Sequence, residues 1–129
     1  MQRNAAEESA LSASDTPTEI RLRRQSRVLE IAFGEQEIHA LPFEFLRVHS
    51  PSAEVKGHGP GQETLVVGKQ AVGIKTIEPV GHYAVRLVFD DGHDTGLYSW
   101  TYLRELGRDR ETLWKRYLER VAAARSFGA

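Results

Sequence analysis

The chain has 129 residues, and its net charge is −1 with neutral histidines. This length suits one domain, and the near-neutral charge provides no bulk attraction for nucleic acid or membrane. Because cysteine is absent, the chain cannot form a disulfide, a thiolate nucleophile or a cysteine-bound zinc or iron–sulfur site. No apolar run approaches the ~20 residues of a transmembrane helix. The N-terminus also lacks the apolar core of a secretory signal, so we expect a cytoplasmic, bacterial protein.

The domain organisation follows from where periodic patterns begin and end. Residues 1–16 are rich in alanine, serine and glutamate without a stable period, and we expect a disordered tail there. A single domain is predicted over residues 17–125, followed by a short C-terminal tail over residues 126–129.

Three strands open the predicted domain. The first places Ile20 and Leu22 on one face, and the second follows the same alternation over residues 27–33. A turn at Gly34 leads into a third strand over residues 36–42. Short turns between consecutive strands predict an antiparallel meander.

The strand pattern stops at Pro42, which can open a helical turn because proline is tolerated at the first helical position. Ser50 and Pro51 repeat that signal. We expect Ser50 to cap a second helical turn, with Glu54 in its first turn and Gly57 as its end.

Strands resume after a glycine-rich loop at residues 57–62. The predicted strands are residues 63–67, 71–80, 83–89 and 94–100. A tight turn at Asp91-Gly92 joins the last two, because this pair suits a turn with positive φ. In residues 83–89, alternation places one apolar row on a single side: Tyr83, Val85, Leu87 and Phe89.

Two helices close the chain. The first begins after Ser99 as N-cap and ends before Gly107, and the second begins after Asp109 as N-cap and runs to about Arg125. One apolar stripe of the second helix should pack on the sheet; it comprises Leu113, Trp114, Tyr117, Leu118 and Val121. The predicted fold class is therefore α+β: a small, mainly antiparallel β-structure with short helical turns after the third strand and two C-terminal helices packed on the sheet.

No enzyme motif is visible in the sequence, and no catalytic residue is predicted. The glycine-rich loop lacks the Lys-Ser/Thr of a phosphate-binding loop, and the serines lack the context of a nucleophile elbow. Four basic residues between Arg21 and Arg27 permit two interpretations: a solvated strand edge with arginine stems over apolar surface, or a nucleic-acid contact.

Three histidines are candidates for a metal site. His49, His58 and His93 lie in loops or at element ends, where imidazoles could bind iron or zinc. Their spacing does not form a compact ligand pattern, so ordinary hydrogen bonding is the competing interpretation. His39 and His82 are expected to serve surface or local hydrogen-bonding roles.

Several motifs together carry a family resemblance. They are Leu46-Arg47 before Ser50-Pro51-Ser52, the Gly-His-Gly-Pro-Gly loop at residues 57–61, and Asp91-Gly92-His93 followed by Tyr98-Ser99-Trp100. From about Thr18 to Leu118 the sequence resembles the gamma-butyrobetaine hydroxylase-like N-terminal domain family. We identify a bacterial, stand-alone member of this group, a domain of unknown function.

The resemblance implies a zinc site whose ligands have changed. In the eukaryotic hydroxylases, a segment similar to W-L-R-D-N-C-P-C-x-x-C and a later histidine hold a structural zinc. The cysteine positions fall on Ser50, Ser52 and Val55, and the histidine on His93. Serine hydroxyl is a weak zinc ligand and valine is none, so capping and packing should replace the metal.

The resemblance also implies an accessory role. Family members precede a separate iron- and 2-oxoglutarate-dependent domain or are fused to iron–sulfur cluster carriers, whereas no facial triad is evident here. We therefore expect a non-catalytic binding or interaction module without a cofactor. Its partner should be another protein, such as a metalloenzyme or an iron–sulfur assembly component. The alternative is an accessory protein that binds iron or zinc through His49, His58 and His93.

The expected binding surface joins the glycine-rich loop, the turn after residue 49 and the hairpin at His93. Its candidate residues are Arg47, His49, His58, Asp91, His93 and Asp94. Arg47 could grip a carboxylate or phosphate through its two-pronged guanidinium, or form a salt bridge inside the fold. Both roles for Arg47 remain open from sequence.

Overall fold

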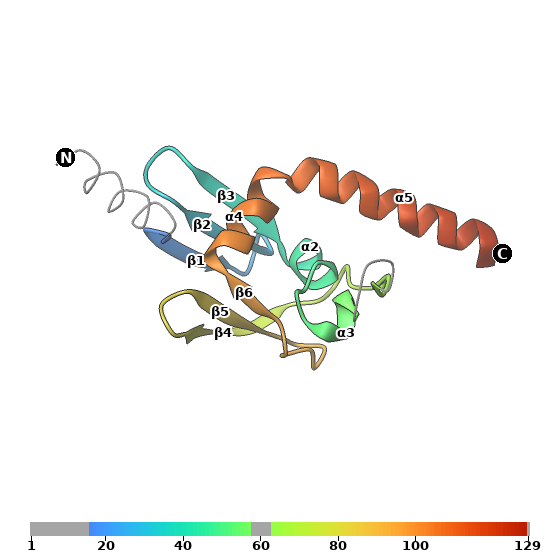
Figure 1. Cartoon of the computed structure of the whole chain (residues 1–129), viewed down its shortest axis with the longest axis horizontal. Coiled ribbons are helices and arrows are strands. Elements are labelled where there is room, and N and C mark those ends of the chain that lie inside the picture. The colour runs from blue at the N-terminus through green and yellow to red at the C-terminus, as the bar shows by residue number, and fades with distance from the viewer. Residues whose placement is uncertain (1–15, 58–62, 129) are drawn as a thin grey trace.

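The computed structural model describes residues 16–57 and 63–128. Within these ranges the chain forms two three-stranded sheets and four helices (Figure 1). The first sheet contains β1 (Glu19–Arg23), β2 (Val28–Ala32) and β3 (Ile38–Pro42), and the second contains β4 (Ile74–Val80), β5 (Ala84–Phe89) and β6 (Leu97–Ser99). The helices are α2 (Phe43–Val48), α3 (Ala53–Lys56), α4 (Trp100–Arg108) and α5 (Arg110–Gly128). The predicted α+β class is confirmed.

The first sheet is the predicted antiparallel meander, in the order β1-β2-β3. Ile20 pairs with Ile31 and Leu22 with Leu29, which places the apolar residues of neighbouring strands on one face. Both β2 residues are fully buried. The turn after β2 uses Gly34 at φ 86°, a conformation that residues with a side chain rarely adopt.

The second sheet has the order β4-β5-β6 and is also antiparallel. Val85, Leu87 and Phe89 of β5 are buried in the core, as their alternation predicted. Tyr83 does not join that row, because β5 begins at residue 84 and the Tyr83 side chain is 59% exposed. Gly92 takes φ 93° in the predicted turn after β5.

Residues 63–67 are not the strand that the sequence predicted. The backbone of this segment forms hydrogen bonds with residues of α3 and α5 instead of with a neighbouring strand. The Thr64 N–H donates to the Val55 carbonyl of α3 at 2.7 Å, and the Val66 carbonyl accepts from the Tyr117 hydroxyl of α5 at 2.7 Å. These two hydrogen bonds hold the segment between α3 and α5.

Helix α4 connects the two sheets, since it follows β6 directly and lies against β3 (Figure 1). Its predicted N-cap is confirmed: Ser99 Oγ accepts from the Tyr102 N–H at 3.0 Å. Gly107 does not end the helix. It lies inside the last turn, where a Cβ would approach His39 Cγ to 2.3 Å, so glycine makes room for that ring.

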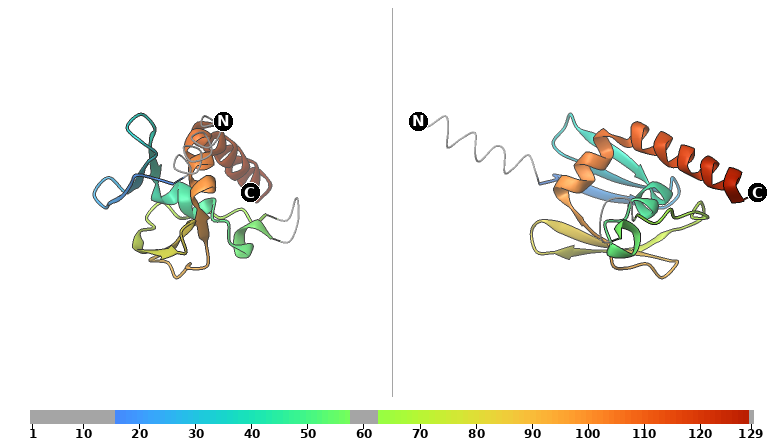
Figure 2. Two further views of the ribbon diagram at one scale, coloured as in Figure 1. Left: turned by 60° about the vertical axis from the view of Figure 1, so that its left-hand side comes forward. Right: turned by 45° about the vertical axis from the view of Figure 1, so that its right-hand side comes forward.

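Helix α5 begins directly after Asp109 and continues to Gly128, beyond the predicted end near Arg125. Its C-terminal part projects past both sheets (Figures 1 and 2). The Trp114 ring packs edge-on against Phe45 of α2, with centroids 6.3 Å apart. Leu118 is 49% exposed. The apolar stripe of α5 thus meets α2 and residues 63–66, while α4 is the helix packed on the sheets.

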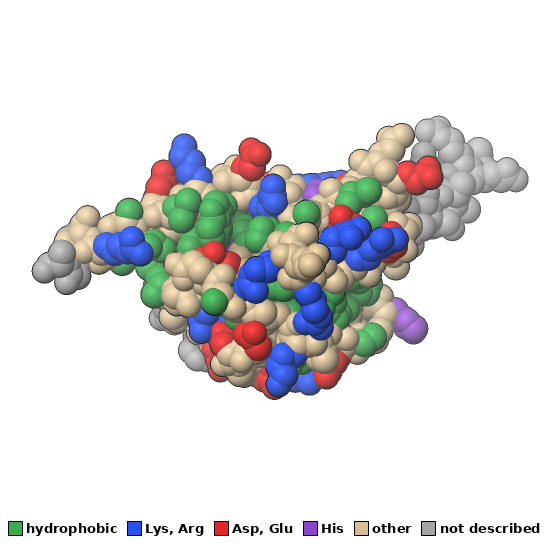
Figure 3. Space-filling view, turned by 180° about the vertical axis from the view of Figure 1, so that it is seen from behind, with side chains coloured by type: hydrophobic (Ala, Val, Ile, Leu, Met, Phe, Trp, Pro, Cys, Tyr) green, Lys and Arg blue, Asp and Glu red, His purple; other side chains and the backbone are tan. Residues whose placement is uncertain are grey.

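The surface is mixed in charge. On the face seen in Figure 3, lysine and arginine side chains are interspersed with aspartate and glutamate. None of the helices in the described ranges is long and apolar enough to cross a membrane.

The basic cluster near β1 is bound within the fold. Arg24 donates to the carbonyls of Ile74 and Lys75 at 2.6 and 3.0 Å, which joins the first sheet to the second. Arg23 donates to Glu30 at 3.1 Å. Arg27 donates to the Val72 carbonyl. Arg24 and Arg27 thus act as internal links, which the interpretation of the cluster as a solvated strand edge did not include.

Candidate functional site

The turn after α2 and the hairpin after β5 meet in a buried polar centre. Ser50 is 0% exposed and His93 is 7% exposed. Ser50 Oγ lies 2.8 Å from His93 Nε2, and the Ser52 N–H donates to Ser50 Oγ at 3.2 Å. Gly96 leaves room for this contact, because a Cβ there would lie 2.5 Å from Ser50 Oγ.

The helical turn is capped two residues later than the sequence predicted. The N-cap of α3 is Ser52, whose Oγ accepts from the Glu54 N–H at 3.2 Å. Ser52 Oγ also lies 2.7 Å from Thr95 Oγ1, which donates to Glu54 Oε2 at 2.8 Å. Ser50 is not a cap, because its hydroxyl is already used inside the polar centre. Gly57 ends α3, as predicted.

These contacts bring together the four positions that the family resemblance connects with zinc: Ser50, Ser52, Val55 and His93. Val55 is buried, and its N–H donates to the Ser52 carbonyl at 2.9 Å. Two neutral hydroxyls, one imidazole and a hydrocarbon side chain do not supply the thiolate and imidazole donors of a structural zinc site. The residues present therefore do not fit that metal, and hydrogen bonds with apolar packing occupy its place.

The protonation of His93 is set by burial. Burial lowers the pKa of His93 below its ordinary 6.5, and the Arg47 charge adds to this, while nearby carboxylates act in the opposite direction. The ring is therefore neutral at neutral pH. With the proton on Nδ1, which lies 3.4 Å from Glu54 Oε2, Nε2 accepts from the Ser50 hydroxyl. Ser50 then donates once and accepts once.

Arg47 forms an internal ion pair with Asp91. Arg47 Nε donates to Asp91 Oδ2 at 2.9 Å, and Lys69 Nζ lies 2.6 Å from the same oxygen. Burial alone would raise the pKa of Asp91, but hydrogen bonds from Lys69, the His93 N–H and Arg47 lower it to about 2. Of the buried side-chain polar atoms described, Arg47 Nη1 alone lacks a hydrogen-bond partner. The internal salt bridge is the role that the structure shows for Arg47.

The remaining candidates do not converge on one centre. Asp94 pairs with Arg86, whose Nη1 donates to the Asp94 carbonyl at 3.0 Å. His58 lies outside the described residues. Within the described ranges, no three side chains among histidine, aspartate and glutamate are grouped as metal ligands would be.

His49 faces a different part of the molecule from His93. Its Nδ1 lies 2.9 Å from the Phe45 carbonyl, and its ring centroid is 4.6 Å from that of Phe45 and 6.4 Å from that of Tyr117. Burial lowers the pKa of His49, and the charges of Arg120 and Lys56 lower it further. The neutral ring donates its Nδ1–H to the carbonyl.

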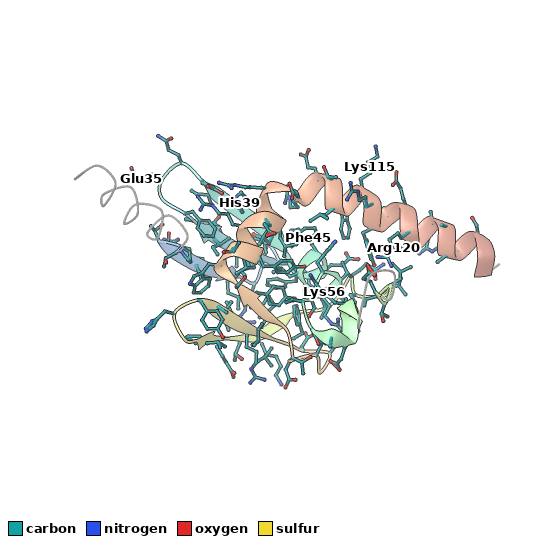
Figure 4. All side chains as sticks on the ribbon, viewed as in Figure 1. Glu35, His39, Phe45, Lys56, Lys115 and Arg120 are labelled. Atoms are coloured by element: carbon teal, nitrogen blue, oxygen red, sulfur yellow. The ribbon has the colours of Figure 1, made fainter. Side chains whose placement is uncertain are left out.

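A pocket of about 520 Å³ opens beside His49, between the end of α2, residues 63–66 and α5. Its walls include Val48, Thr64 and Tyr117, together with Arg116 and Arg120. Figure 4 shows Lys56 and Arg120 bordering the space between α3 and α5. Arg116 and Arg120 are not among the site residues predicted from the sequence, although their spacing of four residues on a helix places them on one side.

Taken together, the paired small sheets, the helical turn after β3 and the buried histidine of the β5–β6 hairpin define a small α+β domain with an internal polar centre. Residues 20–104 match the family described as gamma-butyrobetaine hydroxylase-like, N-terminal. The chain belongs to this family.

Solved structures share the fold. Two proteins determined by NMR in solution are 49% and 53% identical to this chain, with TM-scores of 0.73 and 0.74. The alignments cover 84% and 85% of this chain and 86% and 82% of those chains. A crystal structure from Acidithiobacillus ferrooxidans, described as a protein of unknown function in the DUF971 family, is 41% identical with a TM-score of 0.61, over 74% of this chain and 96% of that one. No curated protein matches.

Proposed function

We propose that this protein is a non-catalytic binding module that recognises a partner through the pocket beside His49. The observation that carries the proposal is a contrast between two neighbouring regions. The polar centre at Ser50 and His93 is buried, and its hydrogen bonds are internal. The pocket is open, and its walls combine aromatic, apolar and charged side chains, a mixture typical of binding sites.

The polar centre contains the residue types of a nucleophile and its base, so the burial of Ser50 decides whether it could act on a substrate. A serine within 2.8 Å of a histidine, with Glu54 on the far side of the ring, resembles a hydrolytic triad. Ser50 is 0% exposed, however, and a substrate carbonyl needs access to the serine oxygen. The arrangement therefore supports a structural role for the three side chains.

The partner class follows from the family resemblance. Similar domains accompany iron-dependent hydroxylases and iron–sulfur cluster carriers, so we take the partner to be a protein of that kind. The alternative, iron or zinc held by His49, His58 and His93, requires the His93 ring to exchange its hydrogen bond with Ser50 for a metal bond.

A pocket-filling substitution tests the proposal. Thr64 lines the pocket with an exposed side chain, so Thr64→Trp fills it while the backbone bond to Val55 remains. Thr76→Trp, on the exposed face of β4, is the matched control. Quantitative affinity purification should show a partner retained by the wild type and Thr76→Trp and lost by Thr64→Trp. Equal retention by all three proteins would contradict the proposal.

A further inference from the structure

Three arginines of α5 differ from the other arginines that the structure describes. The others hydrogen-bond to a carboxylate or a backbone carbonyl within the fold; they are Arg21, Arg23, Arg24, Arg27, Arg47, Arg86, Arg104, Arg108 and Arg110. Within the described ranges, no hydrogen bond or ion pair is formed by Arg116, Arg120 or Arg125. The fold therefore uses the first group, which includes Arg110 at the start of α5, and leaves the guanidinium groups of Arg116, Arg120 and Arg125 available.

Two of these three arginines line the pocket beside His49. Arg116 and Arg120 are separated by one helical turn, which places their Cβ atoms roughly 6 Å apart on one side of α5. Tyr117, between them, fixes this part of the helix by donating its hydroxyl to the Val66 carbonyl at 2.7 Å. Both arginine side chains thus border the same opening.

The pocket environment is positive. Lys56 and Arg120 both act on His49 strongly enough to lower its pKa, in addition to burial, so two cations lie near that ring. Within the described lining, Glu63 is the one acidic side chain, and it has no ion-pair partner among the described residues. Two arginines of the same lining, Arg116 and Arg120, outnumber it. This excess of positive charge favours an anionic ligand.

We propose that Arg116 and Arg120 bind an oxyanion group in this pocket, either a phosphate or a carboxylate presented by an acidic segment. The proposal rests on the pocket being the recognition site of the module. A guanidinium matches the geometry of both groups through two parallel N–H donors. A pair of arginines one turn apart neutralises a dianion or two neighbouring carboxylates.

Titration of ¹⁵N-labelled protein at pH 7 tests the proposal with two probes, inorganic phosphate and a short all-glutamate peptide. The test variant is R116Q/R120Q. The matched control is K115Q/R125Q, which removes the same charge from exposed positions of α5 that do not line the pocket. Figure 4 shows Lys115 on the side of α5 away from Lys56.

The expected result is saturable shifts of the amide signals of residues 64–66 and 116–120 with at least one probe. The control should bind as the wild type does, and R116Q/R120Q should bind at least tenfold more weakly. The responding probe identifies whether phosphate or carboxylate is the source. Absence of saturable shifts with both probes, or equal weakening in both variants, would overturn the inference. A partner that is lost by Thr64→Trp but retained by R116Q/R120Q would leave the binding module intact and refute only its anion specificity.

Discussion

Ser50→Ala is the substitution that probes the polar centre most sharply. The change removes one hydroxyl oxygen from a fully buried position. It also removes the partner of His93 Nε2, at 2.8 Å, and of the Ser52 N–H, at 3.2 Å. Because both groups remain buried, neither can recover its hydrogen bond from bulk water.

The expected loss follows from those two contacts. Each buried polar group left without a partner costs about 1–3 kcal/mol, and the longer Ser52 contact should contribute the smaller share. We expect the free energy of unfolding to fall by about 2–4 kcal/mol in total. For a domain of this size, ~1 kcal/mol corresponds to a shift of ~4 °C in Tm, so the melting temperature should fall by roughly 8–16 °C.

Urea denaturation followed by tryptophan fluorescence measures the change, with Tm from circular dichroism as a second readout. Ser26→Ala is the control, because Ser26 is an exposed serine in the turn between β1 and β2, where a substitution changes stability by about 0.5 kcal/mol or less. The reasoning would be refuted if Ser50→Ala and Ser26→Ala were equally stable.

Three further outcomes are expected. Because the folded protein holds His93 neutral with a pKa below 6.5, the unfolded chain binds more protons than the folded protein as pH falls through 6.5. The free energy of unfolding measured by urea denaturation should therefore decrease between pH 7.5 and 5.5, and it should decrease less steeply in His93→Gln. Identical slopes for the wild type and His93→Gln would contradict this expectation. Gly107→Ala should destabilise the protein by about 1–3 kcal/mol through overpacking against His39, and a gain in Tm would show that the ring moves freely. Tyr117→Phe should cost about 1 kcal/mol in urea denaturation through loss of the bond to Val66, whereas an unchanged midpoint would mean that this contact does not stabilise the fold.

Strands, turns and helix caps could be predicted from the sequence where they depend on contacts between residues close together in the chain. The alternation of β1 and β2, the glycine turn at Gly34 and the cap at Ser99 each depend on contacts a few residues away. A local capping signal gave the wrong N-cap at Ser50, because Ser52 caps α3. Serine before proline is a good local cap, but Ser50 is engaged by His93, 43 residues later in the chain.

The pocket proposed as the binding site could not be predicted in the same way, because its walls come from distant segments. Residues 63–67 have a strand-like composition, yet Val55 and Tyr117 supply their partners. From the sequence, Arg116 and Arg120 are typical of a solvated helix face; only the tertiary structure, which places α5 beside His49, shows that they line the pocket. Tertiary contacts, which no local pattern encodes, decide both features.

Hydrogen bonds and packing hold the turn between α2 and α3 at the place where the family resemblance implies a metal. Elemental analysis of purified, untagged protein, with melting before and after a chelator, tests this role most directly. We predict substoichiometric zinc and iron and an unchanged Tm. Stoichiometric metal that is lost in His93→Ala, together with a chelator-induced fall in Tm, would contradict the account.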